Sequence, residues 1–236
     1  MRPKLVTFDC AETMVGVPRD WSMGWFAASC ARQIGLQPTE DDARLYQKLY
    51  VARLPEFVEV NIARDPERQR AFWSCLARDW LTAAGLPGSA LERMETAADE
   101  LGFGPQSILF KLYEDVVPCL DRLDALGIHA AVVSNWDYSL HRVLRMFGIY
   151  ERFVVVKASL EEGIEKPDPR LFWIALEESG FTPAETVHVG DDPVDDIEGA
   201  TAAGIRAVRI DRSLERTEPP VVRTLLDLPE ALNWTG

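Results

Sequence analysis

Polar residues stand at the ends of three apolar, strand-like runs, and their types suit chemistry on an anionic group. The run "LVTFD" ends at Asp9, "AVVSN" ends in Ser134 and Asn135, and "VHVGD" ends at Asp191. In open parallel sheets, ligands bind just outside the carboxyl ends of the strands. We therefore expect these residues to meet in a functional site at one end of a sheet.

A cluster of acids follows the last of these runs. The stretch "GDDPVDD" adds Asp192, Asp195 and Asp196 to Asp191. So many carboxylates near Asp9 would repel one another strongly unless a cation lay among them. Ligands that are oxygen atoms only, with no His or Cys nearby, favour Mg²⁺. Acids at a helix start are also favourable by themselves, but together with Asp9 and the lysine motif below they predict a magnesium site.

A lysine lies in the stiff turn "GIEKPDPRLF". Pro167 and Pro169 hold the chain extended and then open a helix, which leaves Lys166 at the turn. A cation at this place could offset the acids and hold a phosphoryl oxygen. Lys157, in "VVVKAS", is the second choice for this role.

The composition is that of an ordinary globular protein with a real core. Hydrophobic residues make up 47% of the 236 positions, and charged residues make up 27%. A net charge of -13 argues against nucleic acid and anionic membrane surfaces as partners, because the long-range field repels phosphate polymers. The sequence shows neither an apolar run long enough to span a bilayer nor an N-terminal signal. We therefore expect a cytoplasmic protein.

The cysteines and histidines show no metal-ligand spacing. The four cysteines are widely scattered, so we expect buried thiols rather than disulfides or a metal site. His129 and His188 lie inside apolar runs, so we expect each to be a core residue rather than a catalyst.

The second half of the chain alternates strand patterns with helix patterns. Apolar strand patterns cover 128–135, 153–156, 186–190 and 205–210, and helical patterns cover 118–127, 139–148, 168–180 and 195–204. Such alternation predicts an α/β fold with a doubly wound parallel sheet that helices cover on both faces. The stretch "RTEPPVV" (216–222) predicts a turn before a final strand and a short helix.

The segment from residue 15 to residue 108 has a different pattern. Helical periodicity runs through 21–35, 40–54, 66–85 and 89–102, with no convincing strand between these stretches. We therefore expect an all-helical cap, residues 15–108, inserted into an α/β catalytic core of residues 1–14 and 109–236.

Together these features resemble the haloacid dehalogenase (HAD) superfamily. Its four motifs occur in order as "FDCAET", "VVSN", "EKPDP" and "VGDDPVDD". The resemblance covers residues 1–14 and about 110–212 and implies a Rossmann-like core. It implies that Asp9 is the nucleophile and that Lys166 stabilises the charge of the transferred group, which Ser134 and Asn135 hold.

The resemblance also implies how Mg²⁺ is bound. Asp9 and Asp191 are the carboxylate ligands, and the residue at Ala11 lends its backbone carbonyl. Asp196, or Asp195, supports Asp191 from the second position of the last motif.

Ala11 is the main departure from the family pattern. Family phosphatases usually carry a second aspartate there, which protonates the leaving alcohol and later activates water, work worth ~10²- to 10⁴-fold. The chain therefore keeps the nucleophile and the metal site but loses the acid–base group. The implied function is a Mg²⁺-dependent phosphatase for a small phosphorylated substrate whose leaving group needs little help. Glu12, one residue later, could substitute, although family members often have glycine there.

Three other functions stay open. Phosphonoacetaldehyde hydrolases look similar at Ala11 and use a cap lysine, and Lys48 is the only lysine of residues 15–108. 2-Haloacid dehalogenases need no second aspartate, but they lack the paired acids and work without Mg²⁺. A subgroup of the superfamily that lacks the second aspartate has poorly defined activity, so a low-activity binding or regulatory protein is the principal alternative.

Overall fold

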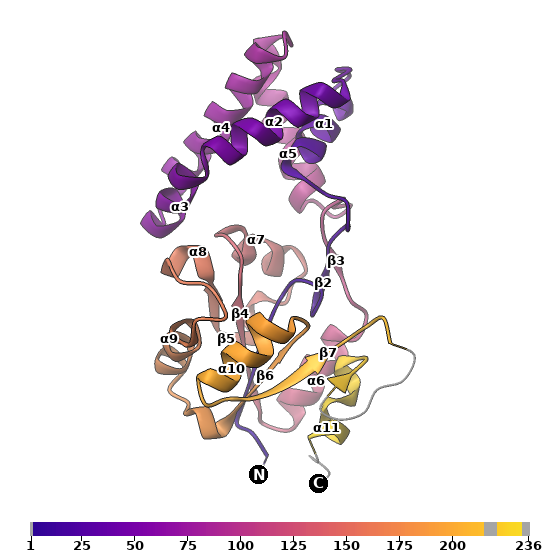
Figure 1. The fold of residues 1–236 in the computed structure, drawn as a ribbon. Coiled ribbons are helices and arrows are strands. Elements are labelled where there is room, and N and C mark those ends of the chain that lie inside the picture. Colours follow the sequence, from indigo (N-terminus) through magenta and orange to yellow (C-terminus); the bar gives the residue numbers. More distant parts are fainter. Residues whose placement is uncertain (1, 215–220, 233–236) are drawn as a thin grey trace. The chain divides into compact units, whose positions relative to one another are not determined.

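The computed structural model describes residues 2–214 and 221–232, and it divides into two compact units. The α/β unit comprises Met1–Gly16 and Leu112–Gly236, and the helical unit comprises Val17–Lys111. The helical unit is therefore an insertion in the sequence of the α/β unit (Figure 1).

A parallel six-stranded sheet lies at the centre of the α/β unit. Its strand order is β5-β4-β1-β6-β7-β8, so β1 is hydrogen-bonded to β4 on one side and to β6 on the other. Because the chain extends the sheet in both directions from β1, the prediction of a doubly wound sheet is confirmed. The strands are β1 (Leu5–Phe8), β4 (His129–Ser134), β5 (Phe153–Ala158), β6 (Thr186–Gly190), β7 (Arg206–Ile210) and β8 (Val221–Val222).

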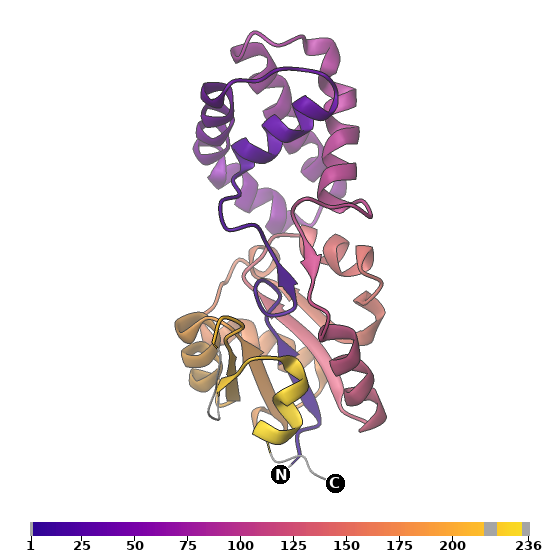
Figure 2. The ribbon, with the colours of Figure 1, turned by 90° about the vertical axis from the view of Figure 1, so that its right-hand side faces the viewer.

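Helices cover both faces of this sheet (Figure 2). On one side lie α9 (Pro169–Ser179) and α10 (Gly199–Ala202), and on the other lie α6 (Val116–Ala125) and α7 (Ser139–Met146). Cover on both faces buries all of β1, as its mainly apolar sequence requires. Short elements complete the unit: η2 (Tyr150–Arg152), α8 (Ser159–Glu162), η3 (Pro183–Glu185), the π-helical turn η4 (Pro193–Glu198), η5 (Leu225–Asp227) and α11 (Leu228–Ala231).

The helical unit consists of five α-helices and one short turn. Its largest core side chains are Trp80, Phe57 and Phe72, all nearly inaccessible to solvent. The Trp80 indole N–H donates to the carbonyl oxygen of Asp42 at 2.7 Å, which ties α4 to α2. The elements are α1 (Met23–Gln33), α2 (Glu40–Ala52), α3 (Leu54–Ala63), α4 (Pro66–Ala83), η1 (Gly88–Ala90) and α5 (Leu91–Phe103).

Several elements differ from the sequence prediction. The pattern over 40–54 does not show α3, which begins at Leu54 directly after α2, with Pro55 in its first turn. Two strands of two residues each, β2 (Val15–Gly16) and β3 (Lys111–Leu112), pair with each other and are too short to show a period.

Two further expectations concern single sites. His188 is fully buried, but the expectation for His129 is wrong, because this residue opens β4 and is exposed. Of the predicted turn at 216–222, residues 216–220 lie outside the described part of the chain. The predicted strand is β8, the last two residues of that stretch, and the predicted short helix is α11. Within the described residues, no helix combines the length and the apolar character that a membrane crossing needs.

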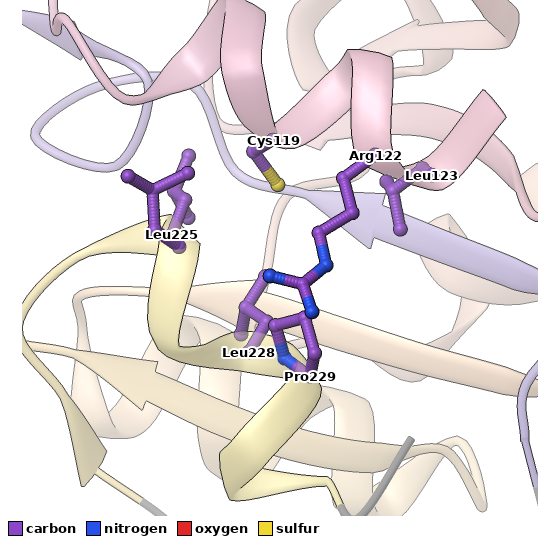
Figure 3. A pocket seen from close by; sticks show the side chains of 7 residues that line it. Cys119, Arg122, Leu123, Leu225, Leu228 and Pro229 are labelled. Carbon is purple, nitrogen blue, oxygen red and sulfur yellow. The ribbon is translucent and has the colours of Figure 1, made fainter. Parts of the chain in front are cut away.

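A small recess lies between α6 and the C-terminal elements of the α/β unit (Figure 3). It includes none of the polar residues at the strand ends. Its walls are mainly leucine side chains, and the residues that line it are Cys119, Arg122, Leu123, Leu225, Leu226, Leu228 and Pro229.

Candidate active site

The register of the parallel strands brings three strand ends together. In the β1–β6 pair, Phe8 lies level with Val189, and the N–H of the next residue, Asp9, donates to the Val189 carbonyl oxygen at 2.9 Å. Ser134 is the last residue of β4, and Asp191 follows β6 directly. All three side chains therefore lie at the carboxyl end of the sheet around the central strand, where α/β folds bind ligands.

Asp9 is a buried carboxylate with one oxygen held by the protein. Its Oδ1 accepts hydrogen bonds from Ser134 Oγ at 2.9 Å and from Lys166 Nζ at 2.6 Å. The Asp9 side chain is 8% exposed and that of Lys166 is 2% exposed, so water screens this ion pair little. Oδ2 accepts no hydrogen bond from the described residues, so this oxygen remains open to a ligand.

The backbone around Lys166 is fixed by Asn135. The Asn135 amide nitrogen donates to the Lys166 carbonyl oxygen at 2.9 Å, and the Lys166 N–H donates to Asn135 Oδ1 at 2.7 Å. Asp168 then caps α9 by accepting from the N–H of Arg170. This reciprocal pair of hydrogen bonds explains why a lysine in a proline-rich turn can reach the end of β1.

Asp196 anchors the same lysine from the other side. Its Oδ1 accepts from Lys166 Nζ at 2.5 Å and lies 3.1 Å from His188 Nε2, and its Oδ2 accepts from the Asp192 N–H at 3.0 Å. The carboxylate fills the place that a side chain on Gly190 would occupy. The carboxylate of Asp196 is therefore held at both oxygens.

The charges of this buried group are strongly coupled. Burial raises the pKa of Asp9 above its usual range, although the charge of Lys166 opposes the shift. Burial alone would lower the pKa of Lys166, but Asp9 and Asp196 raise it. Burial also disfavours the charged form of Asp196, yet the hydrogen bond from His188 and the charge of Lys166 hold its pKa below the usual range. Lys166 and Asp196 therefore form a charged pair beside Asp9.

Asp191 completes a cluster of carboxylates. Burial, together with the charges of Asp9 and Asp196, raises the pKa of Asp191 to about 7. Ligand oxygens of Asp9, Asp191 and Asp196 lie within 4.8 Å of one another. Three carboxylates around one lysine leave an excess of negative charge, and oxygen ligands suit a hard divalent cation. The residues present therefore fit such an ion.

The loop after Asp9 contains Ala11 in a tight turn. The Ala11 carbonyl oxygen accepts from the Thr13 N–H at 2.6 Å, and its methyl side chain offers no acid. Glu12 follows with φ of 54°, in the left-handed region, and its carboxylate accepts from the Tyr113 hydroxyl at 2.9 Å. The guanidinium of Arg212 lies 3.9 Å above the Tyr113 ring and donates to the Thr13 carbonyl oxygen at 2.6 Å.

The alternative candidates from the sequence analysis do not contact Asp9. Lys157 pairs with Glu162 and Glu178 at 3.2 and 2.5 Å rather than with Asp9. Asp195 accepts from the Asn135 amide at 3.0 Å, and Lys48 is an exposed residue of α2. The structure therefore brings together Asp9, Ser134, Lys166, Asp191 and Asp196, with Asn135 behind them. Sequence reasoning missed Tyr113 and Arg212, which no motif marks.

The residues of the candidate active site lie within the part of the chain that resembles a known protein family. A family model described as a haloacid dehalogenase-like hydrolase matches residues 3–204. The chain belongs to this family. It is a hydrolase with an α/β HAD core, as the motifs at Asp9, Ser134, Lys166 and Asp191 led us to expect.

Named relatives and a solved structure agree with this assignment. Haloacid dehalogenase-like hydrolase domain-containing protein 3 of Danio rerio is 30% identical to this chain. The match covers 96% of this chain and 95% of the relative. A phosphoserine phosphatase of Thermus thermophilus is 36% identical over 65% of this chain and 58% of its own length. Among solved structures, a 2-haloacid dehalogenase of Pseudomonas syringae matches all of both chains with a TM-score of 0.68 and 26% identity.

Proposed function

We propose that this hydrolase is a phosphatase of small phosphorylated molecules and that Asp9 is its nucleophile. The observation that carries the proposal is the buried Asp9 carboxylate, with Oδ1 held by Lys166 and Ser134 and Oδ2 free of hydrogen bonds from the described residues. A carboxylate can attack a phosphoryl group only where the negative charges of both are offset, and Lys166 supplies part of that offset.

The reaction has two steps. Asp9 Oδ2 attacks phosphorus, the bond from phosphorus to the leaving oxygen breaks, and the phosphoryl group stays on Asp9. Water then attacks phosphorus, the bond to Asp9 breaks, and phosphate leaves with the carboxylate restored. Ser134 and Lys166 hold the transferred group, and Asn135 supports it by fixing the backbone of Lys166. Because Ala11 carries no acid, the leaving oxygen takes its proton from water.

The carboxylate cluster supports a dependence on Mg²⁺. We assign Asp9 and Asp191 as ligands, with Asp196 in support, since these three carboxylates form the acidic group described above. The Ala11 carbonyl oxygen is added as a ligand because the resemblance to the family implies it. The ion would supply the positive charge that offsets the phosphoryl oxygens.

The helical unit fits the role of a substrate-selecting cap. It is inserted in the sequence directly after the loop that carries Asp9, and caps of this kind exclude water and choose the substrate. We therefore expect the residues of Val17–Lys111 to determine which small phosphorylated molecule is the substrate.

Dehalogenation is the competing activity, because a structure named as a 2-haloacid dehalogenase matches the whole chain. The carboxylate cluster favours phosphate chemistry instead, because a haloacid carboxylate would meet three carboxylates with only one lysine among them. Because 2-haloacid dehalogenases work without Mg²⁺, they would have no cation to offset the charge of these carboxylates.

The test is an assay of both reactions on one preparation. Phosphate release from a panel of small phosphate esters is measured with Mg²⁺ and with EDTA, and halide release is measured from 2-chloropropionate. We expect Mg²⁺-dependent phosphate release that D9N abolishes and that D121N, a change on the exposed face of α6, leaves intact. Halide release without phosphate release would replace the proposal by dehalogenation. If the protein releases neither phosphate nor halide, the result would favour the binding or regulatory protein.

A further inference from the structure

A chain of hydrogen bonds runs from the candidate active site into the centre of the sheet. Thr7 of β1 and His188 of β6 are direct partners in the parallel register, and their exposed fractions are 1% and 0%. Thr7 Oγ1 lies 2.9 Å from His188 Nδ1, and His188 Nε2 lies 3.1 Å from Asp196 Oδ1. The buried side chains of Thr7 and His188 thus contact each other, and His188 also contacts Asp196, which anchors Lys166.

The chemistry of the partners fixes the direction of these hydrogen bonds. A carboxylate oxygen can only accept, so His188 Nε2 must carry a proton and donate to Asp196. Nδ1, the other nitrogen of the ring, faces the Thr7 hydroxyl. The Thr7 hydroxyl then donates to Nδ1 at 2.9 Å, because the other acceptor in reach, the Val187 carbonyl oxygen, is 3.5 Å away.

We propose that Thr7 and His188 are positioning residues for the Lys166–Asp9 pair. The Thr7 hydroxyl holds His188 as the Nε2–H tautomer, His188 fixes the Asp196 carboxylate, and Asp196 holds Lys166 at the nucleophile. The expected effect on catalysis rests on the proposed phosphatase function. The tautomer assigned to His188 does not depend on that function.

The geometry explains why Asp196 depends on this support. Its Oδ1 is shared by Lys166 at 2.5 Å and His188 at 3.1 Å, so the oxygen that receives the lysine is also the one that the histidine directs. The Phe172 ring packs edge-to-face with the imidazole, with ring centroids 4.9 Å apart, which limits other orientations of His188. A histidine with its proton on Nδ1 would turn a lone pair toward the carboxylate and would weaken the anchor of Lys166.

The first arm of the test reads the tautomer directly. Uniformly ¹⁵N-labelled protein is studied by long-range ¹H–¹⁵N correlation NMR, which distinguishes the two nitrogens of each imidazole. The chain has three histidines, and H129Q and H141Q assign the signals of the other two. We expect the Nε2–H pattern for His188, and either an Nδ1–H pattern or a doubly protonated ring would overturn the proposal.

The second arm measures the consequence for turnover. T7V keeps the shape of the side chain but removes the hydroxyl, and T7S restores it. We expect T7V to lower kcat for p-nitrophenyl phosphate by about 10- to 100-fold with KM nearly unchanged, the usual range for a lost supporting contact. T7S should recover most of the rate, and T7V should lose the single Nε2–H pattern.

Thr186 provides the matched control. It is also buried in the sheet, in β6, and its hydroxyl donates to the Thr182 carbonyl oxygen at 2.9 Å, outside this chain of contacts. T186V should lose stability but keep kcat. An unchanged kcat in T7V, or an equal fall in T186V, would refute the positioning role. If the parent protein releases no phosphate, the proposed function fails while the NMR arm still decides the tautomer.

Discussion

Gly190 gives the sharpest prediction, because the structure leaves no room for a methyl group there. A Cβ on Gly190 would lie 2.1 Å from Asp196 Cγ, 2.2 Å from its Oδ2 and 2.5 Å from its Cβ. Real Cβ atoms essentially never approach heavy atoms so closely. In G190A the Asp196 carboxylate must therefore move by about 1 Å or more to reach ordinary contact.

The magnitude follows from what that movement breaks. Overpacking of a core costs about 1–3 kcal/mol, and a buried charge left without its partner costs about 3–5 kcal/mol. Because both come from the same displacement, they overlap, and we expect a loss of about 3 kcal/mol in the free energy of unfolding. Lys166 loses its 2.5 Å contact with Asp196 at the same time, and misplacement by about 1 Å lowers kcat/KM by about 100-fold.

Two assays measure these effects. Urea unfolding followed by tryptophan fluorescence gives the stability, and phosphate release from p-nitrophenyl phosphate gives kcat/KM. G88A is the matched control, because a Cβ on Gly88 meets no heavy atom within 4 Å. A G190A protein that unfolds at the parent urea concentration and turns over at the parent rate would refute the described packing of Asp196.

Two further predictions concern the acid–base group and the metal. A11D should raise turnover of alkyl phosphates by up to ~10²- to 10⁴-fold while changing p-nitrophenyl phosphate much less, as measured by phosphate release; equal gains on both substrates would contradict the account. The pKa of Asp191 is about 7 in the folded protein against an ordinary 3.8, so the folded state binds more protons between these values. Without metal, the free energy of unfolding should therefore fall as pH rises from about 4 to about 7. In D191N this component should be absent, and added Mg²⁺ should raise the urea midpoint more at pH 8 than at pH 5. A metal effect that is equal at both pH values would argue against Asp191 as a ligand.

The sheet and the strand ends could be predicted because their signals are local. Apolar runs that stop at Asp9, Ser134 and Asp191 mark the ends of buried parallel strands, and parallel strands place those ends on one side of the sheet. The proline-rich turn at Lys166 was a weaker signal, and only its contact with Asn135 shows how the lysine reaches Asp9.

The remaining features depend on contacts between distant parts of the chain. His188 could be placed in the core, but its pairing with Thr7 requires the β1–β6 register. The Glu12 carboxylate depends on a left-handed backbone and on Tyr113, which lies far along the chain. α3 was missed because only Arg53 separates it from α2, so the hydrophobic pattern shows no clear gap. No local pattern carries this information.

The nucleophilic role of Asp9 is tested most directly by rapid mixing of the protein with p-nitrophenyl phosphate and Mg²⁺. Released nitrophenolate is followed in time, and acid-quenched samples are examined by mass spectrometry for a phosphoryl group on Asp9. Since this leaving group needs no proton, Ala11 does not limit the first step. We predict a burst near one equivalent followed by slow turnover, with phosphoprotein in the parent and none in D9N. Turnover without any phosphoprotein, or a D9N variant as active as the parent, would contradict the account.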